Sequence, residues 1–269
     1  RCSSRTAARS TQGNHAAVVL GRIKRIAAAS NWLVPFMAIG YVIAGMIVLA
    51  VHWDRIPGAF ALIFETAFTG TAAAGGFAGA AMMAAIRYGV ARGIFSNEAG
   101  LGTAGSAQAA GMSSSPVRSG LIGMMGTFFD TIVVCSMTGL AIVVSGVWTT
   151  GKTGAELTQL AFQTAMPGIG DEVVGVALAI FAITTIFGWS YYGERCWQFL
   201  AGAWTITPYR ILWTVAVFFG AVTHLDLAWT LADTLNALMA VPNLIALLAL
   251  APVVVRLTRE QLADVLADR

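Results

Sequence analysis

Two acidic residues, Asp130 and Asp233, lie inside long apolar runs of the sequence. A carboxylate within a membrane span is costly, and it marks a functional site by default. Hydroxyl-bearing residues flank both acids, with Thr131 beside Asp130 and Thr234 beside Asp233. These hydroxyls also permit a structural role, in which each carboxylate accepts hydrogen bonds and fixes helix packing. Both interpretations, a gate and a packing group, stay open for the two acids.

Two adjacent glycines, Gly75 and Gly76, precede Phe77 in another apolar run. Consecutive glycines weaken a helix and free its backbone groups. Such a break persists in a bilayer only where it is buried in protein or lines a cavity, and broken helices form the midplane sites of secondary transporters. The alternative is close helix packing through the small residues Gly75 and Gly79.

A third polar feature is the pair Thr184-Thr185, which precedes Trp189. Adjacent hydroxyls and free carbonyl groups are the kind of oxygen ligand that sodium needs. Trp189 follows Thr185 by one helical turn and lies on the same face, where it would cap a small apolar side chain. The structural alternative is that the threonines bond to their own helix and that the tryptophan belongs to an interfacial belt.

The connector 91–104, ARGIFSNEAGLGTA, is the most polar stretch between the second and third apolar runs. We expect Ser96 or Asn97 to cap a following helix, with Glu98 in its first turn. Asn97 and Glu98 fit either a cytoplasmic gate or a role in holding the connector in place. Motifs of soluble enzymes, such as HExxH and GxSxG, do not occur in the sequence.

The composition places these features in a membrane protein. Of the 269 residues, 57% are hydrophobic and 11% are charged, and the mean hydropathy is +0.74. Soluble domains carry roughly a quarter charged residues, so this chain cannot coat a globule with polar surface. The net charge of +3 comes from scattered basic residues, a pattern that disfavours nucleic-acid binding. The three cysteines lack ligand spacing, which disfavours a disulfide framework or a zinc site.

The apolar runs predict an all-α polytopic membrane protein with about six transmembrane helices. The predicted spans cover residues 31–51, 71–90, 117–147, 172–192, 208–223 and 227–254. Residues 153–168 are amphipathic and too short to cross a bilayer, so we expect a re-entrant or surface helix there. The serines before Pro116 predict a helix start at the third span.

The distribution of Lys and Arg predicts the orientation of the spans. Six spans that start in the cytoplasm place most basic residues at cytoplasmic ends, and leave only Arg55 and Lys152 at outer ends. Both ends of the chain are then cytoplasmic, with residues 256–269 as a short charged helical tail. The polar residues 1–15 lack the apolar core of a signal peptide, which indicates a processed terminus or a fragment.

The motif RGIFSNEAGLGTA in the connector, together with TTIFGWSYYGE at residues 184–194, resembles the alanine or glycine:cation symporter family of sodium-coupled carriers. The likeness covers a membrane domain at about residues 18–255, and it includes Asp130-Thr131 and the stretch NALM at 236–239. Residues 1–17 form a polar N-terminal segment outside the likeness. The connector motif is long, which makes the resemblance specific.

The resemblance implies a leucine-transporter-like fold, in which two inverted five-helix repeats surround a midplane site. The six spans would then be the C-terminal part of that fold. By resemblance, Thr184 and Thr185 would bind sodium, and Thr185 and Trp189 would contact the substrate. Residues 75–77 would form the unwound strip that faces the substrate.

The implied function is sodium-coupled symport of alanine or glycine across the cytoplasmic (inner) membrane, with sodium as the co-transported ion. The resemblance also implies that the chain lacks a preceding N-terminal half. One alternative is a non-transporting polytopic scaffold or accessory subunit, and another is an intramembrane enzyme that uses Asp130 and Asp233. The residues do not distinguish alanine from glycine, or sodium from proton coupling.

Overall fold

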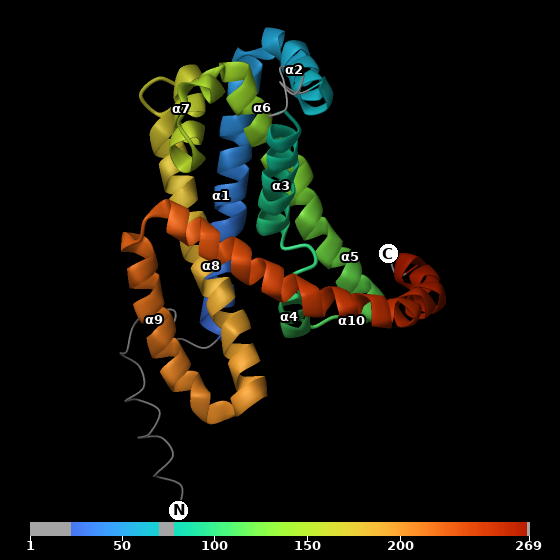
Figure 1. Cartoon of the computed structure of the whole chain (residues 1–269). Coiled ribbons are helices and arrows are strands. Elements are labelled where there is room, and N and C mark those ends of the chain that lie inside the picture. The colour runs from blue at the N-terminus through green and yellow to red at the C-terminus, as the bar shows by residue number, and fades with distance from the viewer. Residues whose placement is uncertain (1–22, 70–77, 268–269) are drawn as a thin grey trace, which may run out of the picture. The chain divides into compact units, whose positions relative to one another are not determined.

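The structure is a computed structural model that describes residues 23–69 and 78–267 (Figure 1). Every regular element in these two stretches is helical, as expected for an all-α protein. A π-helical segment, Phe128–Cys135, is called the π segment below. The α-helices are α1 (Ile23–Val51), α2 (Ile56–Thr69), α3 (Ala78–Asn97), α4 (Thr103–Ala110), α5 (Pro116–Thr127), α6 (Ser136–Ser145), α7 (Gly154–Ala165), α8 (Gly170–Ala201), α9 (Ile206–Val222) and α10 (Leu225–Ala267).

Five helical stretches in the described part of the chain are long and apolar enough to cross a membrane. They match five of the six expected spans and fit a polytopic membrane protein. The other expected span, 71–90, begins among residues outside the described stretches and continues into α3. The five stretches are Trp32–Val51, Pro116–Ser145, Gly170–Ala201, Ala203–Val222 and Leu225–Ala263.

The third expected span is one 30-residue helical rod that changes type in the middle. It starts as predicted, because Ser115 is the N-cap and its Oγ accepts the Val117 N–H at 3.2 Å, with Pro116 in the first turn. In the π segment the backbone bond reaches five residues back, from the Ser136 N–H to the Thr131 carbonyl. Such insertions are rare and frequently occur at functional sites.

The sixth expected span and the expected tail form a single helix. α10 runs for 43 residues without a break, although Pro242 and Pro252 lie inside it. A continuous helix supplies the backbone hydrogen bonds that water cannot supply inside a bilayer. Near the C-terminal end of α10, Ser115 Oγ donates a hydrogen bond to Gln261 Oε1 at 2.8 Å. A short helix, α7, occupies most of the range 153–168, and its position in the membrane stays a prediction.

The chain divides into two compact units, which are described separately here. Among the described residues, the smaller unit contains 23–39 and Ala177–Thr223, and therefore most of α8 and all of α9. The larger unit contains Gly40–Val176 and the residues from His224 onward. The predicted sodium ligands belong to the smaller unit, and the connector and both intramembrane acids belong to the larger one.

The core of the larger unit lies among α1, α6 and α7. Val48, Ala141 and Phe162 are fully buried there. The Tyr41 ring stacks on Phe162 with 5.4 Å between centroids, and the Tyr41 hydroxyl lies 2.8 Å from Thr138 Oγ1. Apolar packing with one internal hydroxyl pair therefore fixes these three helices to one another.

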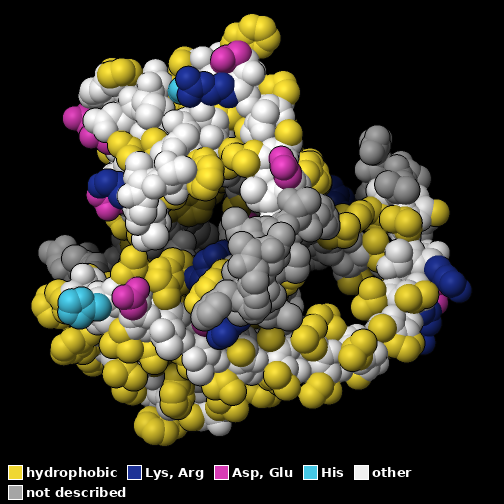
Figure 2. Space-filling model, turned by 45° about the horizontal axis from the view of Figure 1, so that its top comes forward, with side chains coloured by type: hydrophobic (Ala, Val, Ile, Leu, Met, Phe, Trp, Pro, Cys, Tyr) yellow, Lys and Arg dark blue, Asp and Glu magenta, His cyan; other side chains and the backbone are white. Residues whose placement is uncertain are grey.

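Large apolar side chains cover the outside of both units. Phe199 is 89% exposed and Leu248 is 77% exposed. Hydrophobic side chains also predominate on the face shown in Figure 2, where charged groups are scattered. An exposed apolar surface of this extent marks contact with a membrane or with other protein, so it fits helices that are surrounded by lipid.

Candidate functional site

The paired threonines lie near the middle of α8 and differ in their contacts. Thr184 Oγ1 donates to the carbonyl oxygens of Ile180 and Phe181, each at 3.0 Å. Thr185 is exposed, and no hydrogen bond to another described residue occupies its hydroxyl. A donating hydroxyl keeps its lone pairs, so Thr184 is still able to bind a cation. Thr185 nevertheless has the freer hydroxyl of the two.

Trp189 lies one turn after Thr185 and is partly buried. Its ring meets the Tyr192 ring edge-on, with 6.2 Å between centroids. Ser190, beside it, is buried and donates to the Phe187 carbonyl at 2.7 Å. The helix therefore presents an exposed hydroxyl and an indole ring on one face. Their roles in binding sodium and substrate stay predictions.

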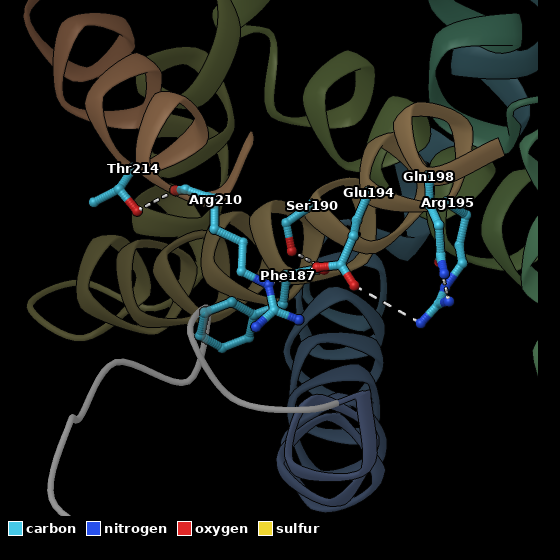
Figure 3. Close-up of polar contacts among 7 residues, drawn as sticks. All are labelled: Phe187, Ser190, Glu194, Arg195, Gln198, Arg210 and Thr214. Atoms are coloured by element: carbon cyan, nitrogen blue, oxygen red, sulfur yellow. Dashed lines mark hydrogen bonds and ion pairs between the residues drawn. The ribbon is translucent and has the colours of Figure 1, made fainter. Parts of the chain in front are cut away.

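Toward the end of α8, the buried carboxylate of Glu194 meets two arginines (Figure 3). Arg210 of α9 donates from Nε to Glu194 Oε2 at 2.7 Å. Arg195 Nη2 lies 3.7 Å from Glu194 Oε1, and its Nη1 donates to Gln198 Oε1 at 2.6 Å. Both carboxylate oxygens thus face a positive charge, and the ion pair ties α8 to α9.

The connector after α3 departs from the expected helix cap. α3 continues through Asn97 and the next helix starts only after Gly102, so the prediction that Ser96 or Asn97 caps a following helix is wrong. The cause is a series of left-handed residues, Glu98 at φ 55°, Gly100 at 81° and Gly102 at 88°. A right-handed helix ends at such residues and does not continue through them.

Side chains from α10 and the π segment hold this connector. Asn243 Nδ2 of α10 donates to the Gly100 carbonyl at 2.9 Å. A Cβ at Gly102 would lie 3.1 Å from Asn243 Oδ1, which is a tight contact, and the φ of 88° also favours glycine at this position. Asn97 Nδ2 donates to Thr131 Oγ1 at 3.0 Å. These contacts support a role for Asn97 in holding the connector in place.

Asp130 lies in the π segment and accepts hydrogen bonds from two hydroxyls. Ser96 Oγ of α3 lies 3.0 Å and 2.8 Å from its two carboxylate oxygens. Thr131 Oγ1 lies 3.3 Å from Oδ2, and Ser96 Oγ is also 3.4 Å from Cys135 Sγ. Both donors are neutral, so they orient the carboxylate without compensating its charge.

Asp233 of α10, in contrast, has a charged partner. Arg92 of α3 forms an ion pair with its Oδ1, and the guanidinium carbon lies 4.0 Å from the centroid of the Trp229 ring. The pair lines a cavity of about 700 Å³, together with Thr230 and Thr234. Nη1 of Arg92 is buried without a hydrogen-bond partner among the described residues.

The predicted site residues therefore gather in two places. The substrate and sodium residues of α8 lie in the smaller unit, and those of the connector and the two acids surround α3 in the larger unit. Three further predicted residues lie outside the described part of the chain, namely Gly75, Gly76 and Phe77. The first group is Thr184, Thr185 and Trp189, and the second is Asn97, Glu98, Asp130 and Asp233.

Four polar residues of these sites were missed by reasoning from the sequence. The sequence pattern favours Ser96 only as a helix cap and presents Arg92 only as one of the basic residues that set the orientation. They lie four residues apart on one face of α3, and each holds one intramembrane acid. That spacing is the signal that identifies them. Glu194 and Arg210 are sixteen residues apart, and only the α8–α9 hairpin brings them together.

Comparisons with known proteins extend this description. The sequence profile of the sodium:alanine symporter family matches residues 10–267. An uncharacterized transporter of Haemophilus influenzae is 48% identical over 245 residues, which cover 90% of this chain and 54% of that protein. The sodium/alanine symporter AgcS of Methanococcus maripaludis is 47% identical over 248 residues, or 91% of this chain and 54% of the relative. The sodium/proton-dependent alanine carrier protein of Bacillus sp. (strain PS3) is 33% identical over 251 residues, or 86% and 56%.

The chain spans about half the length of these curated relatives. The family match begins within the polar segment 1–17 and covers every described helix. Because the family consists of symporters, the alternative of an intramembrane enzyme is excluded. The chain belongs to the sodium:alanine symporter family, whose members transport amino acids together with a cation.

Proposed function

We propose that this chain is part of a sodium-coupled symporter of small neutral amino acids, alanine or glycine, in the cytoplasmic membrane. Family membership carries the proposal, and the printed name of the archaeal relative, a sodium/alanine symporter, supports both the ion and the substrate. Since the chain spans about half the length of its relatives, we assign transport to the full-length protein. The preceding N-terminal half stays an expectation of the family resemblance.

The mechanism follows from the family's expected leucine-transporter-like fold. Sodium and the amino acid bind together near the midplane, and the two repeats rock so that the sodium gradient drives uptake. Thr184 and Thr185 bind sodium, and the exposed hydroxyl of Thr185 supports this role. Trp189 forms a wall of the substrate pocket and limits its volume, while residues 75–77 face the substrate.

The orientation that fits this mechanism places both ends of the chain in the cytoplasm. It rests on the positive-inside distribution of Lys and Arg. Cysteine labelling of the full-length protein in intact cells tests it. We expect a cysteine at position 118 to be protected from an impermeant outside reagent, and strong labelling there would contradict the orientation.

The test of sodium coupling is alanine uptake by the full-length protein in liposomes, measured against external sodium. We expect Thr185→Val to raise the half-saturating sodium concentration about tenfold, which equals roughly 1.4 kcal/mol of lost binding free energy. Thr223→Val is the matched control, because among the described residues its hydroxyl bonds to the Phe219 carbonyl at the end of α9. Alanine uptake by the wild type that does not depend on external sodium would contradict the proposal.

The same preparation separates the carrier from the alternative of a non-transporting scaffold or accessory subunit. A scaffold needs neither the threonine pair nor the indole, so it predicts no transport and no effect of either substitution. The carrier predicts that Trp189→Ala weakens alanine uptake, while Trp197→Ala, which removes an exposed ring from the same helix, leaves uptake unchanged.

A further inference from the structure

Asp130 lies at the centre of a membrane-spanning helix. It is the fifteenth of the 30 residues in the stretch Pro116–Ser145. At 1.5 Å per residue, about 20 Å of helix separates it from either end. An ionised carboxylate at this depth is costly where lipid or protein surrounds it, and a compensating cation or a proton lowers that cost.

The groups around this carboxylate are suited to both of its protonation states. Ser96 Oγ reaches both oxygens, and Thr131 Oγ1 reaches Oδ2. Asn97 donates its amide to Thr131 Oγ1, which leaves the Thr131 hydroxyl proton directed toward Asp130. A hydroxyl donates to a charged carboxylate and accepts from a protonated one, so the cluster keeps its bonds when a proton arrives or leaves.

Three other acids of the described helices lie in a different environment, because each has a basic partner. Arginine and lysine only donate hydrogen bonds, so they favour an acid that remains charged. The described residues include no Lys, Arg or His side chain that forms an ion pair with Asp130. The acids that do have such partners form the pairs Asp233–Arg92, Glu194–Arg210 and Glu156–Lys152.

The elements packed against the π segment bring little charge to Asp130. α6 carries no charged side chain, and the charged residue of α5 lies twelve positions earlier in the chain. On α3 the nearest charge, Arg92, is held by Asp233. None of the titratable or charged groups on these elements and on the connector after α3 forms an ion pair with Asp130 in the described part of the chain. These groups are Arg87, Tyr88, Arg92, Glu98, Arg118 and Cys135.

We propose that Asp130 is the proton-binding site of the transport cycle. The inference rests on the proposed function and adds a second coupling ion to it. The carboxylate takes up a proton when the site faces one side of the membrane and releases it to the other side, so a proton moves together with the amino acid. Ser96 and Thr131 hold the carboxylate in place in both states.

The test uses the purified full-length protein in liposomes that contain a pH-sensitive dye, with equal sodium on both sides. An inward alanine gradient should acidify the interior in the wild type. Asp130→Asn keeps the shape and loses the proton, so we expect the alanine-driven acidification to fall to the rate of protein-free liposomes. Alanine–alanine exchange, which needs no net ion movement, should persist in the same variant.

Two matched variants define the control. Asp54→Asn makes the same substitution outside the apolar spans, at an exposed residue before α2, and should acidify as the wild type does. Asp130→Glu restores a carboxylate and should retain proton movement. Acidification by Asp130→Asn at the wild-type rate would overturn the inference. It would also be overturned if the wild type moved no protons and Asp130→Asn altered only the sodium dependence of alanine uptake.

A third variant decides the case if Asp130→Asn does not fold. Ser96→Ala removes the hydroxyl that reaches both carboxylate oxygens. The charged form then loses a donor, so the pH profile of alanine uptake should shift to higher pH, whereas a purely structural role would leave the profile in place and contradict the inference. Wild-type protein that exchanges alanine without moving protons contradicts this inference alone, and wild-type protein with no alanine exchange contradicts the proposed function itself.

Discussion

The α8–α9 hairpin and the π segment each hold a carboxylate inside apolar surroundings, and they do so by different means. Glu194 in the hairpin faces Arg210 and Arg195, so its charge is compensated on both oxygens. Asp130 in the π segment is held by two hydroxyls. The first acid therefore joins two helices through an ion pair, whereas the second has only neutral hydrogen-bond donors, as the proposed proton-binding site requires.

The largest loss of stability is expected when the positive charge that compensates Glu194 in the hairpin is removed. Arg210→Met leaves the buried Glu194 with only the longer contact to Arg195. Removing one partner of a buried ion pair costs about 3 kcal/mol, because it strands the other charge. Thermal unfolding of the purified protein in detergent should show a clear loss, and Arg259→Met, on an exposed position of α10, is the control.

A double substitution sharpens this result. Adding Glu194→Gln to Arg210→Met removes the stranded charge, so a large part of the lost stability should return. The corresponding change at Asp130, to Asn, should cost little stability because its hydroxyl partners can bond to an amide. Equal losses for Arg210→Met alone and for the double variant would contradict the charge-compensation account.

A second substitution in the hairpin disturbs the packing between α8 and α9. A Cβ at Gly193 would overlap the Tyr209 hydroxyl and lie 2.8 Å from Tyr209 Cζ. Gly193→Ala should therefore cost about 2 kcal/mol, the typical penalty of overpacking. Gly188→Ala lies on the same helix with no heavy atom within 4 Å, so it should be neutral or stabilising in the same unfolding measurement.

The features that can be predicted from the sequence alone also differ between these regions. Five of six expected spans have helical counterparts, since length and hydropathy decide a span, although Gly170–Ala201 and Leu225–Ala263 extend well past the predicted ends at 192 and 254. The helix start at Ser115-Pro116 is also predictable, because it depends on local capping chemistry. Contacts between distant segments, such as Glu194 with Arg210, are not readable from local spacing.

The connector shows why the remaining details were not predictable. Asn97 has the chemistry of a helix cap, but the left-handed Glu98 and the glycines after it end α3 instead. The asparagine then bonds to Thr131, 34 positions away in the chain. The π segment carries no local sequence signal of its own, so its coincidence with Asp130 is visible only in the structure.

A smaller effect is expected where the connector meets α10. Asn243→Ala removes the hydrogen bond to the Gly100 carbonyl and should cost about 1 kcal/mol, the usual contribution of one such bond. Asn236→Ala, on the same helix but without a hydrogen bond to the described residues, is the comparison. Unfolding midpoints that are equal for the two variants would show that the connector does not depend on this contact.

The smallest effect is expected at the exposed ion pair between Lys152, just before α7, and Glu156 in its first turn. Lys152 and Glu156 are 43% and 63% exposed, so solvent screens their attraction. Lys152→Ala should change stability by about 0.5 kcal/mol or less. A loss as large as that of Arg210→Met would show that burial is not what separates the strong ion pairs of this protein from the weak ones.

The most direct test of the two-region account measures sodium and proton movement per alanine in the same liposomes, for Thr185→Val and Asp130→Asn. We expect Thr185→Val to raise the sodium requirement and to keep alanine-driven proton movement. We expect Asp130→Asn to lose proton movement and to keep the wild-type sodium requirement. If both variants change both ions alike, the division between the α8 hydroxyls and the π-segment carboxylate is wrong.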